Sequence, residues 1–193
     1  MPQFLKPEKI IIDFKKGFIQ PYTRKKEVRL SELKEYFSNT EEVEKILLRG
    51  EDPLIYEYYE YIYSEDTGNL NLGLTIIYPG KIGNEYYMTK GHFHEKDAAE
   101  FYFCMKGKGM LLMQNKDGEV SVVELEPGSL GYVPPGWGHR TINTGRSRFI
   151  FFFAYPSDAG HNYMIVKEKG FIKIVTEKDK APKVVDNPRY YKT

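Results

Sequence analysis

The feature that most constrains the fold is a long series of short strand-like segments, separated by turn sequences, which begins after Asp52. The segments are rich in β-branched and aromatic residues, and glycine, proline, asparagine or aspartate stands between them. The predicted strands are Leu54–Tyr63, Leu70–Tyr78, Tyr86–Thr89, Ala99–Lys106, Gly109–Gln114, Val120–Leu125, Leu130–Val133, Thr141–Asn143, Arg148–Ala154 and Phe171–Thr176. About ten short strands at this spacing predict an all-β antiparallel sandwich or barrel.

The residues on either side of this strand region have a different character. Residues 1–50 are predicted to form an N-terminal arm and a small helical cap. Residues 179–193 are polar and interrupted by proline, and they are predicted to form a C-terminal arm. Residues 51–178 are the predicted barrel. Because the chain has 193 residues, not far from the ~150 that are usual for one domain, we expect a single structural domain.

Helical signals are confined to the N-terminal part. Ser31 is expected to cap a helix over ELKEYF, and Thr40 is expected to cap a helix over EEVEKILLRG that ends at Gly50. The reason is that serine and threonine hydroxyls accept hydrogen bonds from the first free amides of a helix. Two short strands, Lys9–Phe14 and Lys26–Leu30, are expected in the arm.

Charge and cysteine content argue against several classes of protein. The chain has 28 Lys+Arg and 27 Asp+Glu, a net charge of +1, whereas a nucleic-acid-binding surface needs a marked basic excess. No stretch approaches the roughly 18 apolar residues of a membrane helix, and charged residues interrupt the segment that a signal peptide would occupy. Cys104 is the single cysteine, which excludes an internal disulfide and is typical of a reducing compartment. We therefore expect a cytoplasmic protein without a nucleic-acid or membrane partner.

The histidines all lie in one stretch of the chain, residues 91–163. His92 and His94 stand two apart in GHFHEKDAAE, so both imidazoles point to one face if the segment is extended. Glu100 begins the next predicted strand, and His139 follows a turn in PPGWGHRTIN. Three neutral imidazoles and one carboxylate suit a divalent ion such as Fe, Zn, Mn or Ni, and they leave coordination positions open for a ligand. These four residues are the predicted metal site.

Two segments resemble the sequence motifs of cupins. Gly91–Gly107 is similar to the first motif, and Gly128–Asn143, which reads GSLGYVPPGWGHRTIN, is similar to the second. The resemblance implies the cupin fold, a double-stranded β-helix or jelly-roll barrel. The interval between the second histidine and the glutamate is longer than in most cupins. Glu95 or Asp97 is therefore an alternative acidic ligand, although Glu100 has the favourable strand phase.

A wider set of segments resembles one family of cupins, the archaeal cupin-type glucose-6-phosphate isomerases. These segments are YPGKIG, TKGHFH, YPSDAGHNY and VVDNPR, and the similarity runs from about Asp52 to Arg189. It implies a homodimeric metalloenzyme that interconverts glucose 6-phosphate and fructose 6-phosphate in glycolysis and gluconeogenesis. It also implies one divalent metal ion per subunit, with Fe²⁺ as the expected ion and Zn²⁺, Mn²⁺ or Ni²⁺ as alternatives.

The same resemblance assigns roles to individual residues. The metal ligands correspond to His92, His94, Glu100 and His139, and the catalytic residues to Glu100 and Tyr102. The sugar-phosphate contacts correspond to Tyr56, Thr75, Thr89, Gly91, Tyr102, His161 and Tyr163. Their hydroxyl and amide groups, and His161 when it is protonated, can donate hydrogen bonds to a phosphate dianion. Lys90 is expected to be a solvated side chain or to lie at the pocket rim, and Arg140 to face away from His139 in a structural role.

Two mechanisms and several other activities stay open. Glu100 is the candidate base for a cis-enediol route, whereas a metal-assisted hydride shift needs no base. A related sugar-phosphate isomerase, for example one acting on mannose 6-phosphate, would share the metal and phosphate contacts. A cupin dioxygenase or decarboxylase would use the same metal ligands without phosphate donors, and a non-catalytic sugar-binding cupin often lacks some of the ligands.

Overall fold

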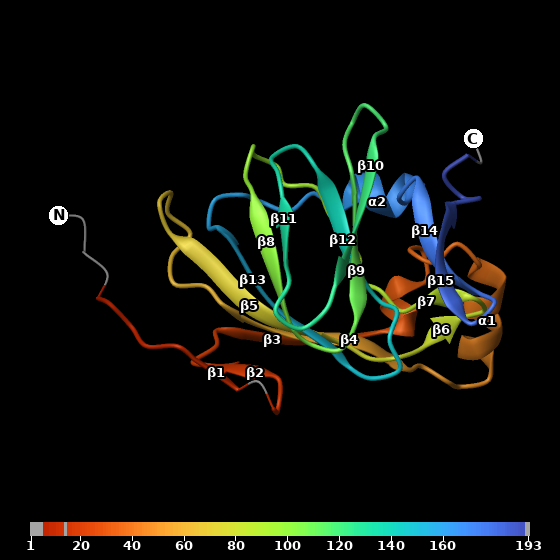
Figure 1. Cartoon of the computed structure of the whole chain (residues 1–193), viewed down its shortest axis with the longest axis horizontal. Coiled ribbons are helices and arrows are strands. Elements are labelled where there is room, and N and C mark those ends of the chain that lie inside the picture. Colours follow the sequence, from red (N-terminus) through yellow and green to blue (C-terminus); the bar gives the residue numbers. More distant parts are fainter. Residues whose placement is uncertain (1–5, 14, 192–193) are drawn as a thin grey trace.

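The structure is a computed structural model that describes residues 6–13 and 15–191. Strands dominate it, and the predicted all-β class is confirmed (Figure 1). The strands are β1 (Ile11–Asp13), β2 (Phe18–Gln20), β3 (Arg24–Arg29), β4 (Leu54–Tyr61), β5 (Leu70–Ile77), β6 (Lys81–Ile82), β7 (Glu85–Tyr86), β8 (Glu100–Lys106), β9 (Gly109–Gln114), β10 (Val120–Leu125), β11 (Leu130–Val133), β12 (Gly138–Asn143), β13 (Phe149–Pro156), β14 (Lys173–Lys178) and β15 (Ala181–Asp186). The helices are the 3₁₀ helix η1 (Leu30–Leu33), α1 (Thr40–Leu48) and α2 (Met164–Lys169).

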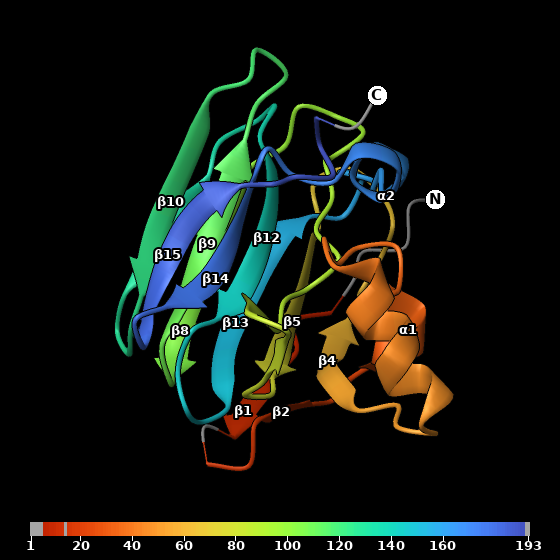
Figure 2. The same cartoon turned by 90° about the vertical axis from the view of Figure 1, so that its right-hand side faces the viewer.

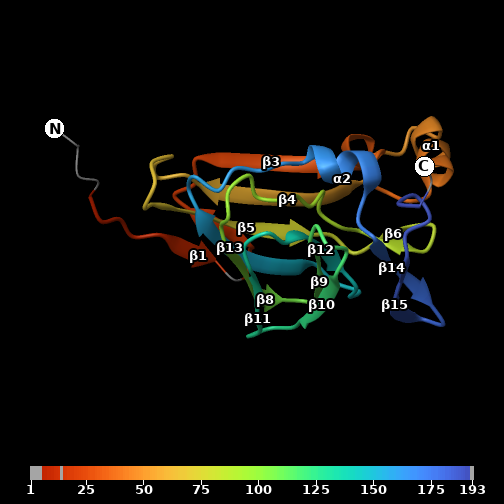
Figure 3. The same ribbon diagram turned by 90° about the horizontal axis from the view of Figure 1, so that it is seen from above.

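Antiparallel pairing arranges the barrel strands in a large sheet and a small one. The large sheet has the order β11-β8-β13-β5-β4-β3, and Figure 3 shows β3, β4, β5 and β13 lying one after another across it. The small sheet has the order β10-β9-β12, and Figure 2 shows these strands in that order, partly covered by β14 and β15. A further sheet, β15-β14-β7-β6, lies at one end, and the β1-β2 hairpin packs on the large sheet through Ile19.

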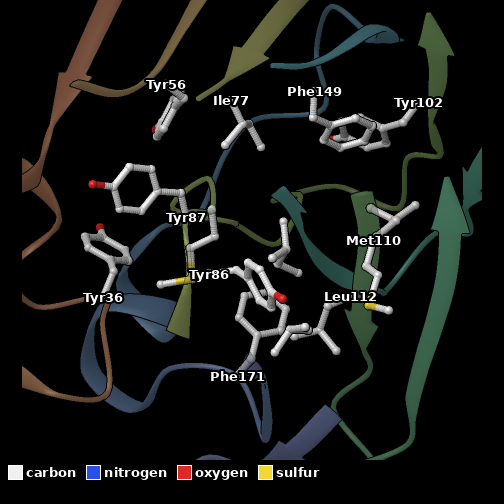
Figure 4. Packing of buried hydrophobic residues seen from close by; sticks show 14 of the residues in the cluster. Tyr36, Tyr56, Ile77, Tyr86, Tyr87, Tyr102, Met110, Leu112, Phe149 and Phe171 are labelled. Carbon is white, nitrogen blue, oxygen red and sulfur yellow. The ribbon is translucent and has the colours of Figure 1, made fainter. Parts of the chain in front are cut away.

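Aromatic side chains fill much of the space between the two barrel sheets (Figure 4). Phe149 and Phe151 alternate with outward residues on β13, are 0% and 1% exposed, and have ring centroids 5.0 Å apart. A Cβ atom at position 109 would lie 2.3 Å from the Phe149 ring, so Gly109 allows β9 to pass close beside it. Part of the high aromatic content therefore forms the core.

The predicted helix caps are wrong, and hydrogen bonding explains both errors. ELKEYF is not an α-helix: η1 covers only its beginning, and turns follow. The Ser31 hydroxyl donates instead to the Asp52 carboxylate at 2.8 Å, and the Ser31 amide donates to the same group at 2.9 Å. α1 does begin at Thr40, but its cap is the preceding Asn39, whose Oδ1 accepts from the Glu42 amide at 3.0 Å.

Four elements were not predicted: β2, β6, α2 and β15. The expectation that helices occur in one place is therefore wrong, because α2 follows the histidine-rich region. β15 pairs with β14 through a tight turn in which Asp179 and Lys180 have φ of +54° and +62°. Such turns are usually indicated by an Asn-Gly or Asp-Gly sequence, and this turn contains no glycine. No helix of the described residues is long and apolar enough to cross a membrane.

Candidate active site

The four predicted metal ligands come together inside the barrel. His92 and His94 lie between β7 and β8, Glu100 is the first residue of β8, and His139 lies in β12. Their ligand atoms are all within 4.8 Å of one another, an arrangement that can hold a metal ion. Main-chain pairing fixes part of this geometry, since the His92 amide donates to the His139 carbonyl at 3.1 Å and the His139 amide donates back at 2.9 Å.

The three imidazoles converge on one oxygen of the Glu100 side chain. The Nε2 atoms of His139, His94 and His92 lie 2.9, 3.2 and 3.6 Å from Glu100 Oε2. Burial alone would raise the pKa of this carboxyl group, but the hydrogen bonds and charges of the imidazoles hold the pKa of Glu100 well below its usual range. Glu100 is therefore a buried carboxylate at neutral pH, which is the state that either a metal ligand or a base requires.

The outer nitrogens of two of these rings are bound to main-chain carbonyls. His94 Nδ1 lies 2.8 Å from the Ala98 oxygen, and His139 Nδ1 lies 3.1 Å from the Trp137 oxygen. A carbonyl oxygen accepts a hydrogen bond, so each ring donates from Nδ1 and directs Nε2 toward Glu100. A metal ion that displaces the proton between Nε2 and Glu100 would find the Nε2 lone pair already oriented. His92 Nε2 is buried without a hydrogen-bond partner among the described residues, which also fits a metal ligand.

The two alternative acidic ligands lie outside this cluster. Glu95 and Asp97 are exposed residues of the loop before β8. The Glu95 side chain packs beside the main chain at position 160. The strand phase predicted for β8 is confirmed, since Glu100, Tyr102 and Cys104 are buried on one face of it. The structure therefore brings Glu100 to the three imidazoles.

A cavity of about 120 Å³ opens beside the cluster. All the residues predicted to contact a sugar phosphate line it: Tyr56, Thr75, Thr89, Gly91, Tyr102, His161 and Tyr163. Burial, together with the neighbouring Glu100 carboxylate, raises the pKa of Tyr102 well above its usual value, so its phenol stays protonated. Gly91 has φ +72°, and a Cβ there would lie 2.8 Å from the His139 carbonyl, so only glycine fits this position without strain. The cavity thus joins potential phosphate donors to the metal-ligand cluster.

Several residues of the cavity were missed by the sequence reasoning. They are Arg24, Tyr58, Glu60, Thr141, Phe151, Phe153 and Tyr155. Tyr155 donates a hydrogen bond of 2.5 Å to Glu60, and Arg24 pairs with the same carboxylate at 3.1 Å. The alternation of β4 was an available signal, because Tyr58 and Glu60 share the strand phase of Tyr56. No local signal places Arg24 there, since it arrives through its register with Glu60.

The two basic residues considered from the sequence, Lys90 and Arg140, differ in where their side chains lie. Lys90 lines the cavity, is half-buried, and has its Nζ 5.7 Å from the centre of the Tyr36 ring. Arg140 faces away from the imidazoles and is only 2% exposed. Burial lowers the pKa of Arg140 to about 10, so the guanidinium remains charged at neutral pH.

His161 makes the stability of the metal-free protein depend on pH. Burial lowers the pKa of His161 to about 4, from the 6.5 of an exposed histidine, so the imidazole is neutral at neutral pH. The unfolded chain takes up this proton near pH 6.5 and the folded chain only near pH 4. The contribution of neutral His161 to the free energy of unfolding is therefore fully present above pH 6.5 and is lost as the pH falls to 4. We expect His161 to account for a loss of about 3 kcal/mol over this range.

The measurement is urea unfolding of the chelator-treated protein at pH 7 and pH 4.5, with His161→Gln as the matched variant. The variant should lose less free energy of unfolding than the natural protein over the same pH change, because glutamine does not titrate. Equal losses in the two proteins would contradict the burial of a neutral His161.

Comparisons with known proteins found similar sequences and a similar fold. A sequence model of the family described as Glucose-6-phosphate isomerase (GPI) matches residues 28–191. The chain is 48% identical over 190 residues to a glucose-6-phosphate isomerase of Thermococcus litoralis, a match that covers 97% of this chain and 98% of that protein. It is also 48% identical over 188 residues to a glucose-6-phosphate isomerase of Pyrococcus horikoshii, with the same two coverages. A solved oxalate oxidase structure has a TM-score of 0.50 over 60% of this chain and 58% of that chain, at 14% identity, a likeness that shows the cupin fold alone.

Proposed function

Because the chain belongs to the glucose-6-phosphate isomerase family, we propose that its cavity binds glucose 6-phosphate and fructose 6-phosphate and interconverts them beside the His–Glu cluster. The enzyme class, an aldose–ketose isomerase, follows from that family membership. The observation that carries the assignment is one cavity lined both by members of the cluster and by all the predicted phosphate contacts. A dioxygenase or decarboxylase would have no use for that set of phosphate donors.

The residues of the cluster fit a divalent metal ion. The donor set is three imidazoles and a carboxylate, and the unpartnered Nε2 of His92 lacks an acceptor or donor that a metal-free role would require. We propose that His92, His94, Glu100 and His139 hold one ion per subunit, and that the ion is Fe²⁺, with Zn²⁺, Mn²⁺ and Ni²⁺ as alternatives. When bound, such an ion supplies a Lewis acid that polarises the sugar carbonyl oxygen.

Glu100 is the residue that we assign to proton transfer. The imidazoles all face its Oε2, so Oε1 is the oxygen proposed to remove the proton from C2 of the open-chain aldose. The electron pair of that C–H bond forms the C1–C2 double bond while the C1 carbonyl pair moves onto O1, which takes a proton from the Tyr102 phenol or from water, and a cis-enediol results. The protonated carboxyl group then returns its proton to C1 as O2 becomes the carbonyl oxygen, and the O2 hydrogen goes back to the group that protonated O1, which gives the ketose. The protonated Tyr102 phenol, buried beside Glu100, is placed to hold or exchange hydrogen with a sugar oxygen.

The phosphate group is proposed to bind to the neutral hydrogen-bond donors that line the cavity. They are the hydroxyls of Tyr56, Thr75 and Thr89 and the main-chain amide of Gly91. Thr89 is held in place by Thr141, whose amide donates to its Oγ1 at 3.1 Å. His161 and Tyr163 form the remaining wall, with their rings stacked 5.9 Å apart. His161 is neutral in the free protein, so it is proposed to donate through its single ring N–H.

A coupled assay of fructose 6-phosphate conversion to glucose 6-phosphate tests this function. We expect turnover of fructose 6-phosphate and a loss of more than about 100-fold in kcat/KM for unphosphorylated fructose, since several hydrogen bonds to the phosphate are lost. Mannose 6-phosphate is the informative competitor, because it differs from glucose 6-phosphate only at C2 and yields the same enediol. No turnover of fructose 6-phosphate with any of the four metals would overturn the proposal. Faster turnover of mannose 6-phosphate than of glucose 6-phosphate would instead assign the chain as a mannose-6-phosphate isomerase.

The remaining proposals concern organisation. We propose that residues 51–178 form the cupin barrel, that residues 1–50 and 179–193 pack on it as arms of the same domain except that β3 adds the edge strand of the large sheet, and that the enzyme is a cytoplasmic homodimer. The family resemblance supports the dimer, and the N-terminal arm is the element proposed to pair or exchange. Light scattering on the purified enzyme measures its mass directly, and a monomer at assay concentration would contradict the proposed homodimer.

A further inference from the structure

Arg140 is a buried cation that the proposed reaction does not use. It follows the ligand His139 in β12 but points to the opposite face, and it is 2% exposed. Its Nη2 donates to the Lys90 carbonyl at 2.6 Å, and its Nη1 donates to the Met88 sulfur at 2.9 Å. The guanidinium carbon lies 4.6 Å from the centre of the Phe171 ring. Its Nε is buried without a hydrogen-bond partner among the described residues.

The charge of Arg140 is not neutralised by a direct ion pair. Within the part of the chain that the structure describes, no carboxylate oxygen lies within 4.0 Å of its nitrogens. Glu85 attracts it only from a longer distance, and the Glu85 carboxylate is itself bound to the Ser38 amide and hydroxyl. A buried charge without a partner is costly, so a neutral side chain would suit a purely structural position better.

The segment that Arg140 holds, Lys90–Gly91, lies where the first motif begins and lines the cavity. On either side of it the chain pairs with β12: the Thr89 amide donates to the Thr141 carbonyl, and His92 pairs with His139. Between these pairs Lys90 and Gly91 leave the regular ladder, and both line the cavity. Gly91 lies directly on Arg140 and Phe171, because a Cβ at position 91 would be 2.8 Å from both side chains. The guanidinium therefore anchors the one stretch of this segment that cross-strand pairing leaves free.

We propose that Arg140 is a positioning residue for phosphate recognition. By holding the Lys90 carbonyl it turns the Lys90–Gly91 main chain toward the cavity, and its unneutralised charge behind that main chain favours a dianionic ligand in front of it. This inference rests on the proposed function for the identity of the ligand. It also gives a role to the C-terminal VVDNPR segment, since Nδ2 of the Asn187 side chain donates to the Phe171 carbonyl at 2.8 Å and so helps to fix the residue whose ring lies against Arg140.

The test compares Arg140→Met, which removes the charge at similar length, with Arg140→Lys, which keeps the charge but loses the planar fork. For Arg140→Met we expect KM for fructose 6-phosphate to rise about 10- to 100-fold, as for loss of a charged hydrogen bond, while kcat changes less than about threefold. For Arg140→Lys we expect a smaller rise in KM. Inorganic phosphate should show the same order of affinities by calorimetric titration, a readout that needs no turnover.

The controls separate this role from damage to the metal site. Metal content per chain should be unchanged in both variants, because His139 is the neighbouring residue. Arg49→Met removes one charge from an exposed position, with 60% of the side chain accessible, and should keep the KM of the natural protein. If Arg140→Met does not fold, Arg140→Lys alone decides, since an unchanged KM and phosphate affinity in it would overturn the positioning role.

The outcomes also separate this inference from the proposed function. A natural enzyme without isomerase activity would overturn the proposed function, while phosphate titration of the Arg140 variants would still test the inference. An active natural enzyme whose Arg140→Met variant keeps its KM and its phosphate affinity would overturn the inference alone. A fall in kcat that follows a fall in metal content would also overturn it, because Arg140 would then act on the metal ligands.

Discussion

Glu100→Gln is expected to lower kcat for fructose 6-phosphate by about 10²- to 10⁴-fold, the usual contribution of a general base. Glutamine keeps the size of the side chain and one oxygen toward the imidazoles, but it cannot accept the C2 proton. The measurement is the coupled assay with metal content determined on the same sample, so that loss of the ion is distinguished from loss of the base. Glu95→Gln is the matched control, since Glu95 is an exposed carboxylate of the loop that precedes β8 and should keep activity within about twofold.

The same variant distinguishes the two mechanisms that the residues leave open. In a cis-enediol route, Glu100 exchanges the transferred hydrogen with solvent, so product formed in deuterated water carries deuterium at the reacting carbon. A hydride shift retains the substrate hydrogen and needs no base. Near-normal kcat in a metal-loaded Glu100→Gln protein, with no solvent deuterium in the product, would contradict the assignment of Glu100 and favour the hydride shift.

Removal of the metal ion is expected to abolish turnover, by at least about 100-fold, and added divalent ion should restore it. Without an ion, the imidazoles face only the Glu100 carboxylate, and no electrophile stabilises the negative charge that develops on the sugar oxygen. The measurement is turnover after chelator treatment and after separate addition of Fe²⁺, Mn²⁺, Ni²⁺ and Zn²⁺. Fe²⁺ is expected to restore the highest kcat/KM, and a higher kcat/KM with another ion would contradict the Fe²⁺ proposal.

Thermal unfolding provides a readout of the same site that does not depend on activity. An ion that binds only the folded chain stabilises it by mass action, by about 4 kcal/mol at a thousandfold excess over Kd, so Tm should rise on reloading. His139→Ala should remove most of that rise, because it deletes a ligand that is 1% exposed. Full activity in a protein shown to be free of metal would contradict the proposed role of the cluster.

Much of the fold was predictable because its signals are local. Gly109–Gln114, Val120–Leu125 and Leu130–Val133 have the predicted bounds, since turn residues enclose each of these strands. The errors lie where a partner far along the chain replaces a local interaction. Ser31 was expected to cap a helix, but its hydroxyl is bound to Asp52. β15 depends on its register with β14 and on an unusual turn at Asp179.

The candidate site likewise contains residues that could be predicted from local signals and residues that could not. The set of candidate metal ligands was predictable because His-x-His spacing and strand phase are local properties, and the structure brings those side chains together in one cluster that could hold a metal ion. The sugar-phosphate residues came from family resemblance, and all of them line the cavity. Arg24, Glu60 and Tyr155 were not foreseen, because their contact requires three strands, β3, β4 and β13, to meet.

The sequence by itself determined the strand content, the phase of each strand and the kinds of side chain available for a metal ion and a phosphate. Only the tertiary structure decided that Glu100, rather than Glu95 or Asp97, meets the imidazoles, and that Arg140 holds the Lys90 carbonyl. The physical reason is how far apart along the chain the interacting residues lie. Periodicity sets which way a side chain points from its own strand, whereas its partner depends on cross-strand register and closure of the barrel, which join residues far apart along the chain.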